Sequence, residues 1–102
     1  MMIDRTRICQ DIDAERDRQE QKWGSQLHSW PVWAAILAEE SGEVAEACLQ
    51  AHWHEEGGME HLREELVQAA AVAVQMLEKL DSGDFIEGEL RKIGRASCRE
   101  RV

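Results

Sequence analysis

ILAEESGEVAEA, residues 36 to 47, combines the spacing of an amphipathic helix with acidic side chains beside its apolar face. The apolar residues in and around this stretch recur at three- and four-residue steps: Trp33, Ile36 or Leu37, Val44, Cys48 and Ala51. Such spacing predicts a helix over residues 31 to 52 with one continuous apolar stripe. Glu40 and Glu43 are three residues apart, so both lie at the border of that stripe and not on the opposite, solvated face.

Two further helices are predicted on either side of this one. Residues 6 to 22 are strong helix formers with a narrow apolar stripe, made of Ile8, Cys9, Ile12 and Ala14. Gly24 ends that helix, and Pro31 suits the first turn of the next, with Ser29 or Trp30 at the cap. After Gly57 and Gly58, residues 59 to 80 are apolar around most of a helical circumference, which indicates burial by more than one neighbour.

The expected fold is all-α, since no segment shows the alternation typical of a strand. Residues 84 to 92, DFIEGELRK, predict a short fourth helix. We therefore expect a helical bundle with two long antiparallel helices, an N-terminal helix and a short C-terminal helix.

The acidic residues of the two long helices form one predicted constellation. Glu65 and Gln68 repeat the three-residue spacing of Glu40 and Glu43, again within an apolar run. Carboxylates gathered in a partly dry groove repel one another, and a hard divalent cation such as Mg²⁺ removes that cost while also binding substrate phosphates. No E-x-x-H pair occurs among them, which disfavours a di-iron site. The alternative is that they are solvated glutamates on helix surfaces.

These residues carry a resemblance to a known family. Glu39, Glu40 and Glu43 give the pattern E-E-x-x-E, and after 21 intervening residues Glu65 and Gln68 give E-x-x-Q. The pattern resembles the motif of the MazG-like all-α nucleoside triphosphate pyrophosphohydrolases, whose second half is E-x-x-D. The resemblance covers roughly residues 5 to 80, and RQEQKWGSQLHSW, residues 18 to 30, is similar to a subgroup found in phages and bacteria.

The resemblance implies an enzyme that hydrolyses an NTP or dNTP to the monophosphate and pyrophosphate. Glu40, Glu43, Glu65 and Gln68 match the positions that hold Mg²⁺, or Mn²⁺ in its place. Glu39 is our candidate for the residue that orients or deprotonates the attacking water. Gln68 departs from the family pattern and removes one negative charge. The alternative function is therefore a non-catalytic nucleotide-binding or interaction module that retains the fold.

Candidate substrate-binding residues lie around the loop between the first two helices. Trp23 and Trp30 could stack on a nucleobase, while Lys22 and His28 could meet phosphate oxygens. For Trp33, at the helix border, we favour a place in the core. The segment H-W-H at residues 52 to 54 does not predict zinc, because a spacing of two does not bring both imidazoles to one face of a helix.

The composition of the chain limits the kinds of partner that it can bind. The 102 residues carry a formal net charge of −9, which disfavours binding to nucleic acid or to an anionic membrane through a basic face. No apolar run approaches a membrane span, and the charged N-terminus lacks a secretory leader, so we expect a cytoplasmic protein with free thiols.

A chain this short has a marginal core. With the apolar third helix, this predicts a homodimer or higher homo-oligomer in which the long helices of two chains form a four-helix core, as in MazG-like proteins.

Residues 93 to 102, IGRASCRERV, can be back-translated into a widely used short-read sequencing adapter. We interpret them as a non-native tail that follows a single MazG-like domain of residues 1 to 92. A native basic tail is the alternative. No function is assigned to Cys98 or to the arginines of this segment.

Overall fold

The computed structural model describes residues 2–53 and 56–87, which contain three α-helices and no β-strand. The helices are α1 (Arg5–Trp23), α2 (Trp30–His52) and α3 (Gly58–Ser82). The all-α prediction is confirmed, and each helix begins and ends within two residues of its expected bounds.

Local residues explain where the helices begin and end. The Asp4 carboxylate accepts a hydrogen bond from the Arg7 backbone N–H at 3.0 Å and caps α1. Ser29 occupies the cap position of α2 without a side-chain hydrogen bond, and Pro31 lies in its first turn, as predicted. Gly83 ends α3 at φ 74°, a left-handed conformation that glycine adopts without steric cost.

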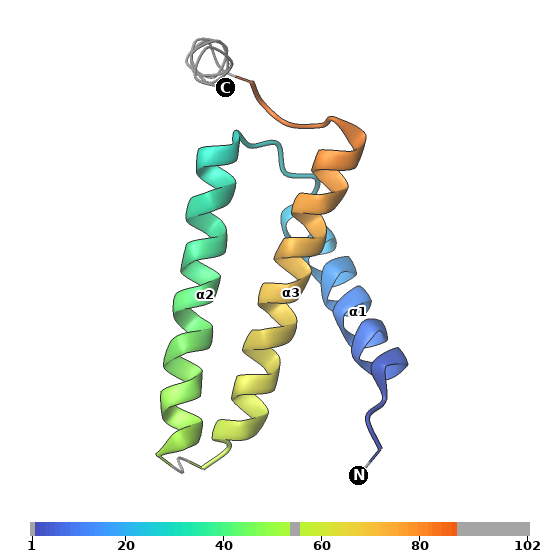
Figure 1. Cartoon of the computed structure of the whole chain (residues 1–102). Coiled ribbons are helices and arrows are strands. Elements are labelled where there is room, and N and C mark those ends of the chain that lie inside the picture. Colours follow the sequence, from blue (N-terminus) through green and yellow to red (C-terminus); the bar gives the residue numbers. More distant parts are fainter. Residues whose placement is uncertain (1, 54–55, 88–102) are drawn as a thin grey trace, which may run out of the picture.

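The helix α3 is the centre of the molecule (Figure 1). The helices α2 and α3 form an antiparallel pair, and α1 packs on α3 without packing against α2. At the closed end of the pair, Gly58 meets the backbone of Ala51, and a Cβ at position 58 would lie 3.0 Å from the Ala51 Cα. Because α1 and α2 each pack on α3 and not on each other, they lie apart on its surface.

The apolar core consists mostly of small residues. Its buried hydrophobic side chains are Trp33, Ala47, Ala51, Ala71 and Val72. Small side chains at these positions allow α2 and α3 to approach closely. The stripe of α2 runs through Ala47, whereas Cys48 is exposed, so this detail of the predicted stripe is wrong. Trp33 is 1% exposed, which confirms its predicted place in the core.

The buried face of α1 is polar, unlike the narrow apolar stripe that its sequence predicted. Arg16 and Gln19 are buried, while Ile8, Cys9 and Ala14 are exposed. The Arg16 Nη2 donates to the Oε1 of Glu78 on α3 at 2.7 Å, and the Arg16 Nε donates to the Oε2 at 3.2 Å. This bidentate pair joins α1 to α3 through charge-assisted hydrogen bonds.

The predicted fourth helix is wrong over its described part, residues 84 to 87. This segment leaves α3 at Gly83 and lies along the loop between α1 and α2, where the Ile86 N–H donates to the His28 carbonyl at 3.1 Å. The Phe85 ring packs on Trp30, with centroids 5.0 Å apart. These contacts hold the segment extended. Residues 88 to 92 of the predicted helix, and the tail predicted at 93 to 102, lie outside the described residues.

A second, apolar surface lies on α2 and α3. A hollow of about 400 Å³ is lined by Trp30, Leu37, Ala73, Met76, Leu77 and Leu80. Leu77 and Leu80 are 57% and 55% exposed.

None of the described helices combines the length and the apolar character needed to cross a bilayer.

Candidate metal centre and adjoining cleft

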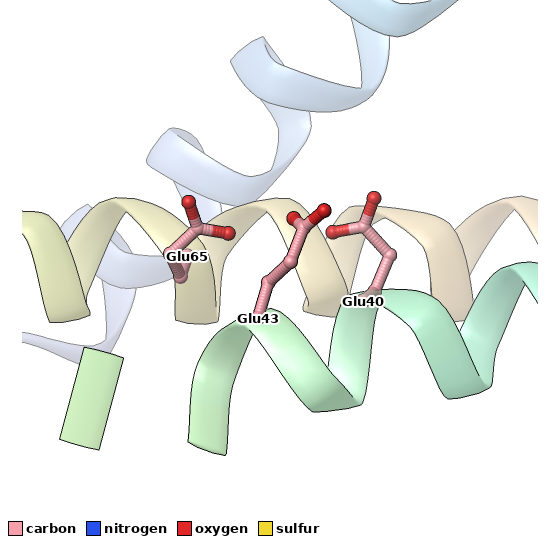
Figure 2. A group of neighbouring side chains, drawn as sticks. All are labelled: Glu40, Glu43 and Glu65. Carbon is pink, nitrogen blue, oxygen red and sulfur yellow. The ribbon is translucent and has the colours of Figure 1, made fainter. Parts of the chain in front are cut away.

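Three glutamates converge between the two long helices. Glu40 and Glu43 project from α2 toward Glu65 on α3 (Figure 2). One carboxylate oxygen from each residue lies within 4.8 Å of the others. We call these three residues the carboxylate triad. It contains three of the four residues predicted to hold a metal.

The triad arises because acidic residues take places in the two apolar stripes. Glu40 lies between Trp33 and Ala47 at helical steps of seven, and it is half-buried. Glu65 takes the equivalent place on α3, and its side chain is 12% exposed. Glu43, by contrast, is exposed. The antiparallel pairing of α2 and α3 then brings the acids of both helices to one position.

Two oxygens of the triad lack a partner. The Oε2 atoms of Glu40 and Glu65 are buried, and neither has a hydrogen-bond partner within the described residues. A buried carboxylate oxygen without a donor carries a desolvation cost, so native structures rarely leave one. A bound cation would satisfy both oxygens.

The pKa values of two triad residues, Glu40 and Glu43, also indicate that the carboxylates lack positive charge around them. Burial raises the pKa of Glu40, and the neighbouring charges of Glu43 and Glu65 raise it further. The pKa of Glu43 is also raised, by loss of hydration and by the neighbouring Glu65 carboxylate. Both shifts mean that burial and mutual repulsion disfavour the ionised carboxylates.

Within residues 2–53 and 56–87, the basic side chain that pairs with the triad is a histidine, which is a cation only when protonated. The His61 Nε2 lies 3.6 Å from the Glu65 Oε1, and this imidazole lowers the pKa of Glu43 by a smaller amount than the carboxylates raise it. Among the ion pairs of the described residues, none joins a lysine or arginine to the triad. The donor set is therefore all carboxylate oxygen, which suits Mg²⁺ or Mn²⁺.

A cleft of about 430 Å³ adjoins the triad. It lies between α1 and α2 with α3 as its floor, and Glu40 belongs both to its wall and to the triad. The other lining residues are Glu15, Arg18, Gln19, Lys22, Trp23, Gln26, Trp33, Ile36, Glu39, Gln68, Val72 and Gln75. A concave space of this size, mixed in polarity and next to a metal-binding group, has the properties of a small-molecule site.

The structure places most of the predicted site residues at this cleft. Glu39, Gln68, Lys22 and Trp23 line it, and the Lys22 ammonium lies 4.8 Å from the centre of the Trp23 ring. Gln68 thus lines the same cleft as Glu40 of the triad.

The other two predicted substrate-binding residues lie elsewhere. The His28 ring packs edge-on against Trp33, with centroids 5.0 Å apart, and its Nε2 lies 3.0 Å from the Gln26 Oε1. Trp30 lines the apolar hollow and contacts Phe85. Neither residue lines the cleft, so any influence that they have on it passes through their neighbours.

Several cleft residues were missed in the sequence. Glu15 and Gln19 were missed, although they share one face of α1 with the predicted Lys22, at steps of four and three residues. That spacing could have identified them, but polar residues on a charged helix resemble an ordinary solvated face. Gln75 was missed because it lies within the apolar run of α3.

Comparisons of the chain with protein-family models, with curated proteins and with solved structures gave no match.

Proposed function

We propose that this protein hydrolyses a nucleoside triphosphate, NTP or dNTP, to the monophosphate and pyrophosphate with the help of Mg²⁺ or Mn²⁺. The observation that carries the proposal is the carboxylate triad, with its two unpartnered buried oxygens, at the wall of a cleft of nucleotide size. The MazG-like motif in the sequence supports the same activity. Glu40, Glu43 and Glu65 would hold the metal.

A divalent cation bound there would neutralise phosphate charge and polarise the anhydride bond that breaks. The rest of the chemistry belongs to the protein. Glu39 lies one residue from Glu40 and lines the cleft, where its carboxylate can orient a water and accept its proton. Water adds to a phosphorus of the α,β-anhydride, the bridging P–O bond breaks, and pyrophosphate leaves.

Cationic side chains on α1 would bind the phosphates. Lys22 and Arg18 both line the cleft opposite the acids of α2. Arg18 is held by the Glu15 carboxylate at 2.6 and 2.8 Å, which fixes its guanidinium at the rim. Charges of both signs along one cleft suit a metal–triphosphate ligand, which is itself both cationic and anionic.

A homodimer is part of the proposal. The apolar hollow on α2 and α3 leaves Leu77 and Leu80 more than half exposed, which is an association surface by default. A second chain placed there would complete a four-helix core from two α2–α3 pairs.

One observation favours a second candidate function. Gln68 stands where the family pattern has an acid, so only three carboxylates surround the metal position. A weaker metal site could leave a module that binds nucleotides without cleaving them.

The test is release of pyrophosphate by the purified full chain from each common NTP and dNTP, with Mg²⁺ and with Mn²⁺. Activity with at least one nucleotide, lost in Glu40→Gln and Glu65→Gln but kept in Glu60→Gln, supports the proposal. Glu60 is a matched control because it is exposed on α3 and lies outside the triad and the cleft. Binding of a non-hydrolysable triphosphate without turnover of any nucleotide would favour the second candidate.

A further inference from the structure

The inner wall of the cleft contains polar groups that are buried and lack partners. The Trp33 Nε1 and the Gln19 Oε1 are inaccessible to solvent, and neither has a hydrogen-bond partner within the described residues. Gln75 is 3% exposed, lines the same cleft, and makes no hydrogen bond in the described part of the chain. Two such atoms, on Gln19 and Trp33, are unusual beside one space, because buried polar atoms are nearly always paired.

The Gln19 side chain has a defined orientation. Its Nε2 donates to the Glu15 Oε2 and to the Gln68 carbonyl, both at 3.3 Å. Both amide protons are therefore used, and the Oε1 remains as an acceptor. The Trp33 indole can only donate, and its ring is held by the edge-on contact with His28. Among the residues that line the cleft, Gln19 thus has a free acceptor and Trp33 a free donor, and the Gln75 amide can supply either.

The remaining surface near these groups favours a flat ligand. Trp23 is 62% exposed and lines the cleft, so the face or edge of its indole is open to stacking. Ile36 and Val72 add apolar area on α2 and α3. The two unpaired atoms and the Gln75 amide carry no charge, so they suit a neutral ligand better than an ionised one, and an entirely apolar ligand would leave the two atoms unsatisfied.

We propose that Gln19, Trp33 and Gln75 recognise the hydrogen-bonding edge of a nucleobase. This inference rests on the proposed function for the identity of the substrate and adds to it the residues that determine base specificity. The base would insert toward the floor of the cleft and offer one donor to Gln19 and one acceptor to Trp33. Because Glu40 lies in the wall of the same cleft, the phosphates would then extend toward the carboxylate triad.

The proposal is tested without phosphates and without metal. Adenosine, guanosine, cytidine and uridine are titrated separately into the full chain in the presence of EDTA, by calorimetry and by ligand-observed NMR, with ribose as the ligand that lacks a base. We expect at least one nucleoside to bind about tenfold or more tightly than another, since a mismatched edge leaves buried groups unpaired. Ribose should not bind.

Two variants test whether Gln19 and Gln75 determine the preference for one nucleoside over another. Gln75→Leu and Gln19→Leu should each weaken the preferred nucleoside about tenfold and reduce the difference between bases. Gln10→Leu is the matched control, because Gln10 is exposed on α1 and does not line the cleft. Circular dichroism melting of each variant verifies that it is folded.

The outcomes separate this inference from the proposed function. Pyrophosphate release by a protein that binds no nucleoside, or binds all four equally, would overturn the assignment of the wall while the hydrolase proposal stands. Selective nucleoside binding that depends on Gln19 and Gln75 supports the assignment even where no triphosphate is cleaved. Equal loss of binding in Gln10→Leu and Gln75→Leu would also contradict it.

Discussion

Glu40 on α2 and Glu65 on α3 place carboxylate oxygens within 4.8 Å of each other, and each side chain has a buried oxygen without a hydrogen-bond partner in the described residues. Repulsion between two such groups opposes the packing of the helices that carry them. The same arrangement becomes favourable when a divalent cation lies between the oxygens. The two long helices are thus held in a geometry that metal binding should stabilise.

Metal should therefore raise the melting temperature of the protein. At a Mg²⁺ or Mn²⁺ concentration ten times its Kd, binding to the native state alone adds about 1.4 kcal/mol, or roughly 6 to 11 °C for a domain of this size. Thermal unfolding with increasing metal, against EDTA, measures the effect. Glu65→Gln should abolish most of the shift and Glu60→Gln should preserve it. A shift of equal size in both variants would place the metal elsewhere.

The stability of the metal-free protein should fall as pH rises through the range in which Glu40 and Glu43 ionise in the folded state. The folded-state pKa values of Glu40 and Glu43 lie above the ordinary value of 4.5, so the native state binds more protons than the unfolded state between 4.5 and the raised values. Stability in this window decreases with increasing pH and is constant above it. Melting temperatures in EDTA from pH 4 to 8 measure the slope.

The Glu40→Gln variant isolates the contribution of Glu40 to the pH dependence of stability. Glu15 acts in the opposite direction, because its hydrogen bond with Arg18 lowers its pKa, so the comparison uses the difference between the wild type and the variant. Without metal, Glu40→Gln should melt a few degrees higher than the wild type at pH 7 and show a weaker dependence on pH. A variant that is less stable than the wild type at pH 7 in EDTA would show that Glu40 has a stabilising partner.

Removing Asp84 should destabilise the protein more than removing Lys79. The Lys79 ammonium is buried and donates to the Asp84 carboxylate and to the Ser25 hydroxyl, both at 3.1 Å. Asp84→Ala leaves a buried cation with one neutral partner, at a cost of about 1–2 kcal/mol, given that Asp84 itself is half exposed. Lys79→Met replaces the cation with an apolar side chain of similar length and should cost less.

Urea unfolding of the two variants measures this difference. Asp81→Ala, at an exposed position in the last turn of α3, is the control for the loss of a nearby acid. Equal destabilisation by Asp84→Ala and Lys79→Met would mean that the ion pair acts as a unit and that burial of the ammonium is unimportant.

Features that depend on interactions between residues near in the sequence could be predicted from it. Helix bounds depend on local signals such as Pro31 and Gly83, and these bounds were predicted within two residues. The convergence of Glu40, Glu43 and Glu65 followed from helical spacing together with the antiparallel pairing of two long helices. The spacing is contained within each helix, and the antiparallel pairing follows from the short connection between α2 and α3.

Features that depend on contacts between distant segments could not be predicted in this way. The buried face of α1 is polar because Arg16 meets Glu78, 62 residues away in the chain. The extended segment after α3 is held by His28 of the first loop and by Trp30 at the start of α2, and these contacts outweigh the helical tendency of its residues. The cleft itself is formed by three helices, so Gln19 and Gln75 became recognisable only when these were assembled.

The exposed apolar surface of α2 and α3 gives the last prediction, a homodimer in solution. Leu77 and Leu80 border the hollow that Trp30, Leu37 and Met76 also line, and a second copy of the α2–α3 pair would bury it. Light scattering of the full chain should give at least twice the mass of one chain. Leu77→Glu combined with Leu80→Glu should give the mass of one chain, because each glutamate would be desolvated in the interface. Ile3→Glu, at a residue 85% exposed ahead of α1, should leave the dimer intact. A wild-type mass of one chain at every concentration, with full helicity, would show that the hollow remains open to solvent.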